Sequence, residues 1–271
     1  MIDIASHYVT VNGIKTHYVE AGEGHPLILV HGGGAGADGY GNWKYSIPLY
    51  AKAGFRAIAI DMIGFGKTDK PENLQYSHDD RINHVVGFIE TLGLKDVYLI
   101  GNSMGGGCTL GVCMKRPDLV KKNVLMGSAG LKIEFNPSLR VIMDYDFTPE
   151  GMQKIVEALT NPNFPIPEDM VQYRYELSLD QGFLQAYKAF MKWAASSPDA
   201  AYPEEKIQAV KTPTLVVNGK LDKVVPVTYA YKFLELLENS WGYIMPHTGH
   251  WAMIEHPEEF AAVTGNFFLN V

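Results

Sequence analysis

The chain has 271 residues, 46% of them hydrophobic, and a formal net charge of −7 at pH 7. Its length and apolar content suffice for one large α/β core with an inserted segment, and the acidic balance argues against a nucleic-acid partner. Two cysteines exclude a disulfide framework, and we expect no metal site, no signal peptide and no membrane span. The sequence therefore predicts a cytoplasmic enzyme.

The first two predicted strands form a β-hairpin. Residues 8–11 and 14–19 flank Asn12-Gly13, a pair that favours tight hairpin turns. Six further strands are predicted, with helical patterns between most of them, near residues 27–31, 55–60, 97–101, 122–127, 213–218 and 241–245. Strands that alternate with helices pair in parallel. We therefore expect an α/β fold with a mostly parallel, eight-stranded sheet flanked by helices.

A glycine-rich segment, His31-Gly32-Gly33-Gly34, follows the strand predicted at 27–31. Consecutive glycines can turn their backbone amides toward a substrate oxygen, as an oxyanion hole requires. A phosphate-binding loop is the competing interpretation. It fails because no Gly-Lys-Ser/Thr follows and the glycines are not spaced G-x-G-x-x-G. We expect His31 itself to be structural.

The most informative motif is Gly101-Asn102-Ser103-Met104-Gly105, which follows an apolar run and precedes a predicted helix. A strand, G-x-S-x-G and a helix in this order are typical of a nucleophile elbow. Small flanking residues are needed because the serine adopts a strained conformation. We predict that Ser103 is the nucleophile and that the amides of Gly33 and Met104 form the oxyanion hole.

The pattern changes between residues 131 and 203. Helical runs there surround a proline-rich stretch at 161–167, carry many aromatic and methionine side chains, and include no convincing strand. We therefore divide the chain into an α/β core of residues 1–130 and 204–271 and an inserted helical lid of residues 131–203. The lid is predicted to form an apolar roof over the site.

A serine nucleophile needs a base and an acid that orients the base. Asp222 lies just after the strand predicted at 213–218 and is the predicted acid. The other position that an acid can take follows the strand at 122–127. The residues there, Gly127 to Gly130, contain no carboxylate.

Two histidines, His247 and His250, follow the last predicted strand. His250 comes after a glycine, and Trp251 and a final helical segment follow it. This setting is the one expected of a catalytic histidine loop. We predict that His250 is the base and that His247 is a loop histidine bonded to backbone.

Read together, these motifs resemble those of the meta-cleavage product hydrolases, bacterial enzymes with the α/β-hydrolase fold. The segments that carry the resemblance are HGGGAGA at 31–37, NW at 42–43, DMIGFGK at 61–67, GNSMGG at 101–106 and GHW at 249–251. The resemblance covers essentially the whole chain. Within the family the sequence is most similar to the carbazole-pathway branch, which acts on a 6-(2-aminophenyl) substrate. Segments 126–131, 144–148 and 240–244 carry that similarity.

The resemblance implies a catalytic triad of Ser103, Asp222 and His250. It also implies a set of substrate contacts: Gly32, Gly34, Asn42, Asn102, Arg174 and Trp251. The arginine has independent support, because a carboxylate substrate needs a cation and a guanidinium can bind it through two hydrogen bonds. A surface arginine is the alternative. Asn102 can either cap the turn or bind substrate.

The implied reaction is the hydrolysis of a carbon–carbon bond in a 2-hydroxy-6-oxo-6-aryl-hexa-2,4-dienoate. It gives 2-hydroxypenta-2,4-dienoate and a carboxylic acid, and it needs no cofactor. The expected partner is this small molecule, with no nucleic acid and no membrane, and the chain is expected to form a homodimer or a larger homo-oligomer. Small residues at 127–130 below an apolar lid favour an aryl over a methyl 6-substituent.

Two other classes of function stay open. A general carboxylesterase uses the same triad but leaves Arg174 and the two asparagines unexplained. A non-catalytic ligand receptor on this fold does not need an intact triad, and turnover excludes it. Dehalogenases and epoxide hydrolases of this fold use an aspartate nucleophile, so Ser103 argues against both.

Overall fold

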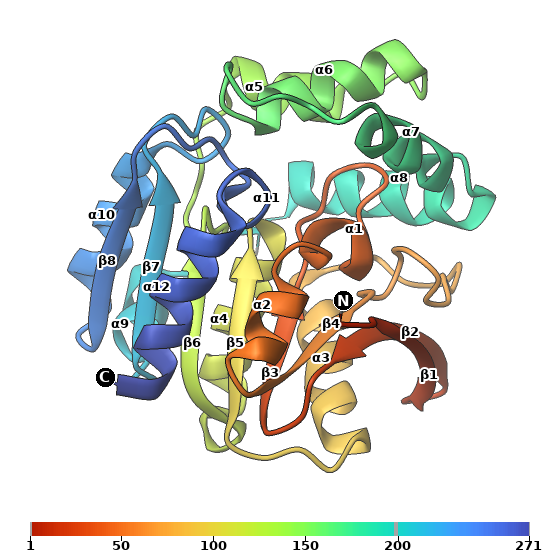
Figure 1. The fold of residues 1–271 in the computed structure, drawn as a ribbon. Helices are drawn as coiled ribbons and strands as arrows, with labels where there is room; N and C mark the ends of the chain where they lie inside the picture. Colours follow the sequence, from red (N-terminus) through yellow and green to blue (C-terminus); the bar gives the residue numbers. More distant parts are fainter. Residues whose placement is uncertain (1, 198–199, 271) are drawn as a thin grey trace.

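The computed structural model describes residues 2–197 and 200–270, which form one eight-stranded sheet with helices on both faces (Figure 1). The strands are β1 (Ala5–Val11), β2 (Ile14–Ala21), β3 (His25–Val30), β4 (Phe55–Ile60), β5 (Val97–Asn102), β6 (Val120–Met126), β7 (Thr214–Gly219) and β8 (Ser240–Met245). Their order across the sheet is β1-β2-β4-β3-β5-β6-β7-β8. Strand β2 is antiparallel to β1 and β4, and all other neighbours are parallel. The predicted fold class is confirmed.

The sheet forms where the sequence supplies short apolar runs. Every residue of β5 and β7 is buried, as expected of strands with helices on both faces. The edge strand β1 is largely exposed. Between β1 and β2, Asn12 and Gly13 have φ values of 50° and 83°, the positive values that a tight hairpin turn requires.

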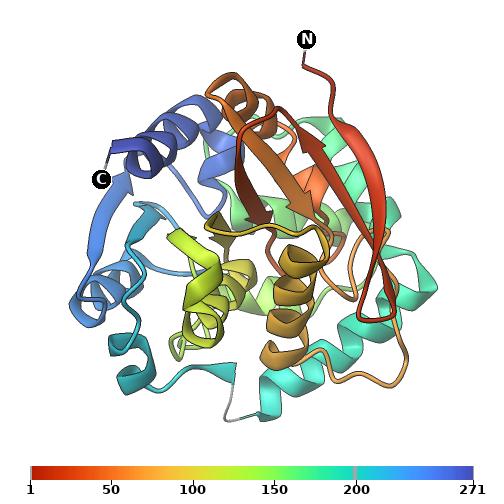
Figure 2. The same ribbon diagram turned by 90° about the horizontal axis from the view of Figure 1, so that it is seen from below.

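Helices cover both faces of the sheet (Figure 2). Helices α2 and α12 lie on one face, and α3, α4 and α10 lie on the other. The helices of the two core segments, with one 3₁₀ turn, are α1 (Gly39–Trp43), α2 (Ile47–Lys52), α3 (His78–Thr91), α4 (Met104–Lys115), η1 (Pro117–Leu119), α9 (Glu204–Gln208), α10 (Val227–Leu236), α11 (Ala252–Glu255) and α12 (Pro257–Asn270). Cys108 and Cys113 are buried and unpaired on α4.

Four consecutive helices lie above the carboxyl ends of the parallel strands (Figure 1). They are α5 (Pro137–Met143), α6 (Pro149–Leu159), α7 (Glu168–Ser178) and α8 (Gln181–Ser196). Helix α6 buries an apolar stripe at i, i+3, i+4 and i+7, from Met152 to Leu159. In α7, the Tyr173 hydroxyl donates a hydrogen bond to Asp38, the residue that caps α1. No strand occurs between β6 and β7 in the described part of this segment.

The order of the strands fixes where a site can form. The chain leaves β3 for its neighbour β4 on one side, and it later returns to place β5 on the other side of β3. The loops that follow β3 and β5 therefore diverge, and a crevice opens at the carboxyl ends of these two strands. The glycine-rich segment and the G-x-S-x-G motif are these two loops.

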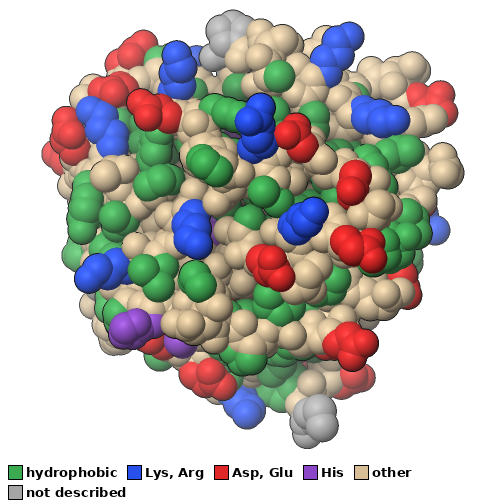
Figure 3. Space-filling view, turned by 90° about the horizontal axis from the view of Figure 1, so that it is seen from above, with side chains coloured by type: hydrophobic (Ala, Val, Ile, Leu, Met, Phe, Trp, Pro, Cys, Tyr) green, Lys and Arg blue, Asp and Glu red, His purple; other side chains and the backbone are tan. Residues whose placement is uncertain are grey.

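Met1, residues 198–199 and Val271, which fall in the predicted core and lid, lie outside the described residues. Among the described helices, none combines the length and the apolar character that a membrane span needs. Seen from the side of α5–α8, charged side chains of both signs are scattered among small hydrophobic groups (Figure 3).

Candidate active site

Ser103 lies in a sharp turn between β5 and α4. Its φ of 56° and ψ of −121° are outside the ordinary regions for a residue with a side chain, as expected of a nucleophile elbow. Its amide donates to the carbonyl of Met126 on β6 at 2.9 Å, and its carbonyl accepts from Gly106 and Gly107 in the first turn of α4. The surrounding backbone therefore holds the strained residue in place.

The two glycines of the motif allow the elbow to pack against the sheet. A Cβ on Gly105 would lie 2.4 Å from the carbonyl oxygens of Val30 and His31, and a Cβ on Gly101 would lie 2.3 Å from the carbonyl oxygen of Gly105. No side chain fits at these distances. The motif therefore needs glycine at both ends, because Gly105 packs against the end of β3 and Gly101 packs against the first turn of α4.

Asp222 and His250 form a buried pair. The Nδ1 of His250 donates to Oδ2 of Asp222 at 2.7 Å, and neither side chain is more than 1% exposed. The other carboxylate oxygen, Oδ1, accepts from the amides of Val224 and Val225, each at 2.8 Å. A carboxylate only accepts hydrogen bonds, so the ring nitrogen Nδ1 carries the proton and Nε2 is free to accept one.

Gly127 is the first residue after β6, the other place where the acid could have been, and its lack of a side chain has a structural reason. It follows β6 with a φ of 49°, and a Cβ there would lie 3.0 Å from both Oδ2 of Asp222 and Nδ1 of His250. The absence of a side chain at this residue leaves room for the acid that comes from the end of β7.

A carboxylate whose role the sequence analysis did not foresee organises the histidine loop. Glu255 accepts hydrogen bonds from the amides of Gly249 and Trp251, on either side of His250, and from the amide of Asn161 after α6. Burial raises the pKa of Glu255, and the hydrogen bonds from these amides oppose the shift. A signal for this residue was present in the sequence, because Glu255 is the glutamate of the segment GHWAMIEHP at 249–257.

The two candidate histidines differ in their surroundings. His250 is buried and lines the cavity, and its amide donates to the carbonyl of Leu159 in α6 at 2.9 Å. His247 is exposed with a φ of 56°, and its carbonyl accepts hydrogen bonds from Asn161 and His256. Of the two, only His250 has a carboxylate partner.

The two predicted oxyanion-hole residues, Gly33 and Met104, lie next to each other. A Cβ on Gly33 would lie 2.6 Å from Sδ and 3.2 Å from Cβ of Met104, so the Met104 side chain packs against the backbone of Gly33. His31 stabilises the glycine segment as a structural residue: its Nδ1 donates to the carbonyl of Gly32, and its Nε2 accepts from the amide of Met62. Burial lowers the pKa of His31 to about 4, so its ring is neutral near pH 7.

Arg174 comes from α7 and is buried, so the surface alternative is wrong. Its Nη2 donates to the carbonyl of Ala35 at 2.9 Å, and its guanidinium lies 4.7 Å from the ring centre of Trp251. Its Nε has no hydrogen-bond partner in the described structure. Burial lowers the pKa of Arg174 to about 10, and the neighbouring Asp38 opposes the shift. The group therefore remains a cation at neutral pH, and its Nε–H is buried without a partner.

The two asparagines are adjacent in the cavity wall. Asn42 donates to Oδ1 of Asn102 at 3.5 Å, and its own Oδ1 is buried without a partner. The amide nitrogen of Asn102 donates to the carbonyls of Met126 and His250. Asn102 therefore connects β5, β6 and the histidine loop, whereas Oδ1 of Asn42 has no hydrogen-bond partner in the described structure.

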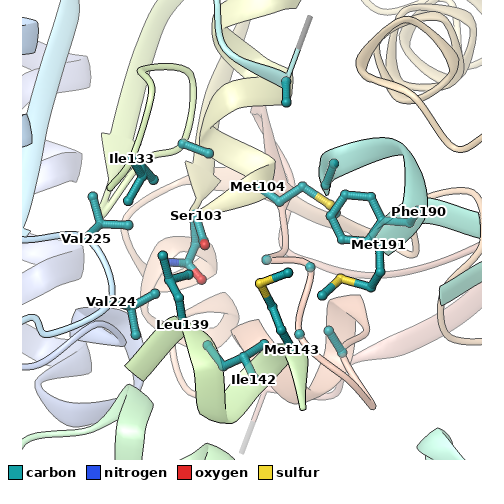
Figure 4. A pocket seen from close by; sticks show the side chains of 18 of the residues that line it. Ser103, Met104, Ile133, Leu139, Ile142, Met143, Phe190, Met191, Val224 and Val225 are labelled. Atoms are coloured by element: carbon teal, nitrogen blue, oxygen red, sulfur yellow. The ribbon is translucent and has the colours of Figure 1, made fainter. Parts of the chain in front are cut away.

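These residues surround one cavity of about 940 Å³ below α5–α8. The predicted site residues that line it are Gly32, Gly33, Gly34, Asn42, Asn102, Ser103, Met104, Arg174, His250 and Trp251. Figure 4 shows Ser103 with Ile133, Val224 and Val225 on one side and Phe190 and Met191 on the other. The volume and the mainly apolar walls suit a small organic ligand, and the arginine suits an anionic one. Within residues 2–197 and 200–270, no cluster of His, Cys, Asp and Glu could hold a metal ion.

Comparison with known proteins places the same features in context. The α/β-hydrolase fold family matches residues 25–257. The chain is 51% identical over 261 residues to 2-hydroxy-6-oxo-6-(2'-aminophenyl)hexa-2,4-dienoic acid hydrolase of Metapseudomonas resinovorans, across 96% of this chain and 89% of that protein. It superimposes on a serine hydrolase involved in carbazole degradation with a TM-score of 0.91 and 49% identity, across 98% and 99% of the two chains. A meta-cleavage product hydrolase from Pseudomonas fluorescens IP01 gives a TM-score of 0.90 and 30% identity, across 97% of each chain.

Proposed function

Because the chain belongs to the α/β-hydrolase fold family and, within it, to the meta-cleavage product hydrolases, we propose that it hydrolyses the C5–C6 bond of a 2-hydroxy-6-oxo-6-aryl-hexa-2,4-dienoate. The 6-(2-aminophenyl) compound is the proposed substrate. The products are 2-hydroxypenta-2,4-dienoate and the aryl acid.

One observation supports this proposal more than any other. The cavity lined by Ser103 and by His250, the partner of Asp222, is also lined by a buried arginine whose Nε has no hydrogen-bond partner. An esterase for neutral substrates does not need this cation, whereas a dienoate carboxylate does. The substrate would bind with its carboxylate at Arg174, near Asn42, Trp251 and the glycine segment.

The apolar remainder of the cavity supports an aryl substituent. Ala129 lines the cavity next to Ser103, and the side chains of Leu139, Ile142 and Val225 stand nearby (Figure 4). Small residues at 127–130 leave room for a ring below α5. Each buried group the size of CH₂ contributes about 0.8 kcal/mol, so a phenyl substituent should gain more than tenfold in kcat/KM over methyl.

The proposed mechanism has two stages. The dienol first takes a proton at C5, with His250 as the shuttle, because the fragment on C5 cannot leave until that carbon is protonated. Ser103 then attacks the C6 carbonyl while His250 takes the hydroxyl proton, and the amides of Gly33 and Met104 stabilise the oxyanion. When the C5–C6 bond breaks, its electron pair passes to the C2 ketone, which takes the proton held by His250, so that 2-hydroxypenta-2,4-dienoate leaves and an acyl group stays on Ser103. Water, activated by His250, hydrolyses that ester to the aryl acid.

The remaining predictions belong to this proposal. Residues 131–203 would act as a lid that excludes water, and no step calls for a cofactor. A homodimer or larger homo-oligomer stays a prediction, which light scattering on the purified protein would measure.

A substrate panel tests the proposed function. Purified protein is given 6-(2-aminophenyl), 6-phenyl and 6-methyl dienoates and, separately, simple aryl esters. We expect loss of dienoate absorbance, with the 6-aryl compounds giving the highest kcat/KM. Fast ester hydrolysis with no dienoate turnover would assign the protein as a carboxylesterase. A panel in which the 6-methyl compound is best would reject the aryl preference.

A further inference from the structure

A second arginine, Arg81, lines the same cavity, and no carboxylate of the described residues is hydrogen-bonded to it. It is the fourth residue of α3 and is fully buried. Its Nη1 donates to the carbonyl of Tyr76, whereas its Nε and Nη2 have no hydrogen-bond partner within the described ranges. The guanidinium lies 4.7 Å from the ring centre of Phe190 and 5.3 Å from that of Trp193, both on α8. These rings stabilise the positive charge, but they do not replace the hydrogen bonds that the N–H groups make in the plane of the guanidinium.

Of the titratable groups near Arg81, His78, Cys108 and Tyr202 are neutral near pH 7. The carboxylate of Asp80 attracts the charge of Arg81, but it accepts its hydrogen bonds from Ser77. His78, one turn earlier on α3, donates from Nε2 to the carbonyl of Ala200, and burial lowers its pKa to about 4. Burial raises the pKa of the Cys108 thiol to about 12 and also raises that of the Tyr202 hydroxyl. Burial lowers the pKa of Arg81 only to about 10, so the guanidinium is charged. None of these groups therefore forms a direct ion pair with the guanidinium.

A buried cation with two unpaired N–H groups destabilises a fold unless something pairs with it. Nε and Nη2 lie on one edge of the guanidinium, and this edge binds both oxygens of a carboxylate side by side. The aromatic rings of Phe190 and Trp193, 4.7 Å and 5.3 Å from the guanidinium carbon, suit a flat apolar group attached to the carboxylate.

We propose that Arg81 forms a second anion subsite in the cavity, which binds the carboxylate of an aryl acid through Nε and Nη2. The choice of ligand rests on the proposed function, because hydrolysis at C6 of a 6-aryl dienoate converts that carbon into an aryl carboxylate. Two sources can supply the ligand. One is the acid that the reaction releases, and the other is a 6-aryl group that itself carries a carboxylate.

Direct binding tests the subsite without any turnover. Benzoate and its neutral counterpart benzamide are titrated into the purified protein by calorimetry. We expect Arg81→Met to weaken benzoate binding about tenfold to a hundredfold and benzamide binding less than threefold. Arg81→Lys, which keeps the charge without the two-pronged edge, should lie between. Unchanged benzoate binding in Arg81→Met, or a loss that appears only in Arg174→Leu, would overturn the proposal.

Arg140→Met is the matched control. Arg140 carries the same charge on α5 and lies 6.0 Å from the ring centre of Phe135, but its side chain is 70% exposed. Its loss should leave benzoate binding unchanged, and an effect equal to that of Arg81→Met would mean that only net charge matters, against the proposal. Should Arg81→Met not fold, a crystal of the wild-type protein with 4-bromobenzoate decides, since the carboxylate must lie against Arg81.

Kinetics distinguish the two sources. If the released acid is the ligand, 2-aminobenzoate inhibits the wild type at least tenfold more strongly than Arg81→Met. If the substituent is the ligand, the KM for a 6-(4-carboxyphenyl) dienoate relative to 6-phenyl rises in Arg81→Met. If neither of these two effects is observed, the proposal is overturned. Arg81-dependent benzoate binding in a protein that turns over no dienoate would refute the proposed function and leave the subsite standing.

Discussion

Asp222→Asn replaces one oxygen of the buried carboxylate by an amide NH₂. The remaining oxygen can still accept from the amides of Val224 and Val225, which lie 2.8 Å from Oδ1. The NH₂ group then faces Nδ1 of His250, where the carboxylate accepted a proton at 2.7 Å. Because NH₂ only donates, the ring must move its proton to Nε2, and His250 can no longer take the proton of Ser103.

We expect kcat for a dienoate to fall by about 10³ to 10⁴, which corresponds to about 4–5.5 kcal/mol in activation free energy. Folding should change little, because the two backbone hydrogen bonds remain. Asp222→Ala is the informative comparison: it leaves both amides unpaired, at a cost of about 1–3 kcal/mol each in the free energy of unfolding.

The assay combines loss of dienoate absorbance with urea unfolding of both variants. An Asp222→Asn protein that is folded and retains more than a tenth of the wild-type kcat would refute the role given to this carboxylate. Equal stability of the two variants would refute the role given to the backbone hydrogen bonds.

Arg174→Leu should lower kcat/KM for a dienoate about tenfold to a hundredfold and for a neutral ester much less, and equal losses would make the arginine structural. Gly127→Ala places a Cβ 3.0 Å from Asp222 and His250, at a residue with a positive φ. We expect kcat to fall about tenfold or more, because the acid–base pair must shift. An unchanged kcat would contradict this packing. Burial, with nearby Asp61, raises the pKa of Asp38 to about 6. The folded protein therefore binds a proton more tightly there than the unfolded chain does, and stability falls as pH rises from about 4 to 6. We expect the urea unfolding midpoint of Asp38→Asn to decrease less than that of the wild type between about pH 4.5 and 7. The same pH dependence in both proteins would refute this expectation.

Much of the architecture could be predicted because its causes are local. Each predicted parallel strand is a short apolar run, and Asn12-Gly13 determines the first turn. The errors are at strand ends: β3 begins at His25 and β6 at Val120, two residues before the predicted starts. Side chains there are partly polar, so the apolar run marks the buried part of a strand and not its full hydrogen-bonded length.

The parts of the site that could not be predicted depend on contacts between distant segments. The sequence offers no local signal that Glu255 accepts from Asn161, or that His250 is hydrogen-bonded to Leu159 of α6. From the sequence alone, Arg81 looks like an ordinary polar residue near the start of a helix. Its burial becomes visible only when α8 packs over α3.

The role of Ser103 as nucleophile in a C–C bond hydrolase is tested most directly by comparing the wild type with Ser103→Ala on the 6-(2-aminophenyl) dienoate. Both products are quantified together with the loss of absorbance. We predict that the wild type forms one equivalent each of 2-hydroxypenta-2,4-dienoate and 2-aminobenzoate. Ser103→Ala should bind the dienoate and form neither product above a slow background. Product formation by Ser103→Ala at the wild-type rate would contradict the proposed mechanism.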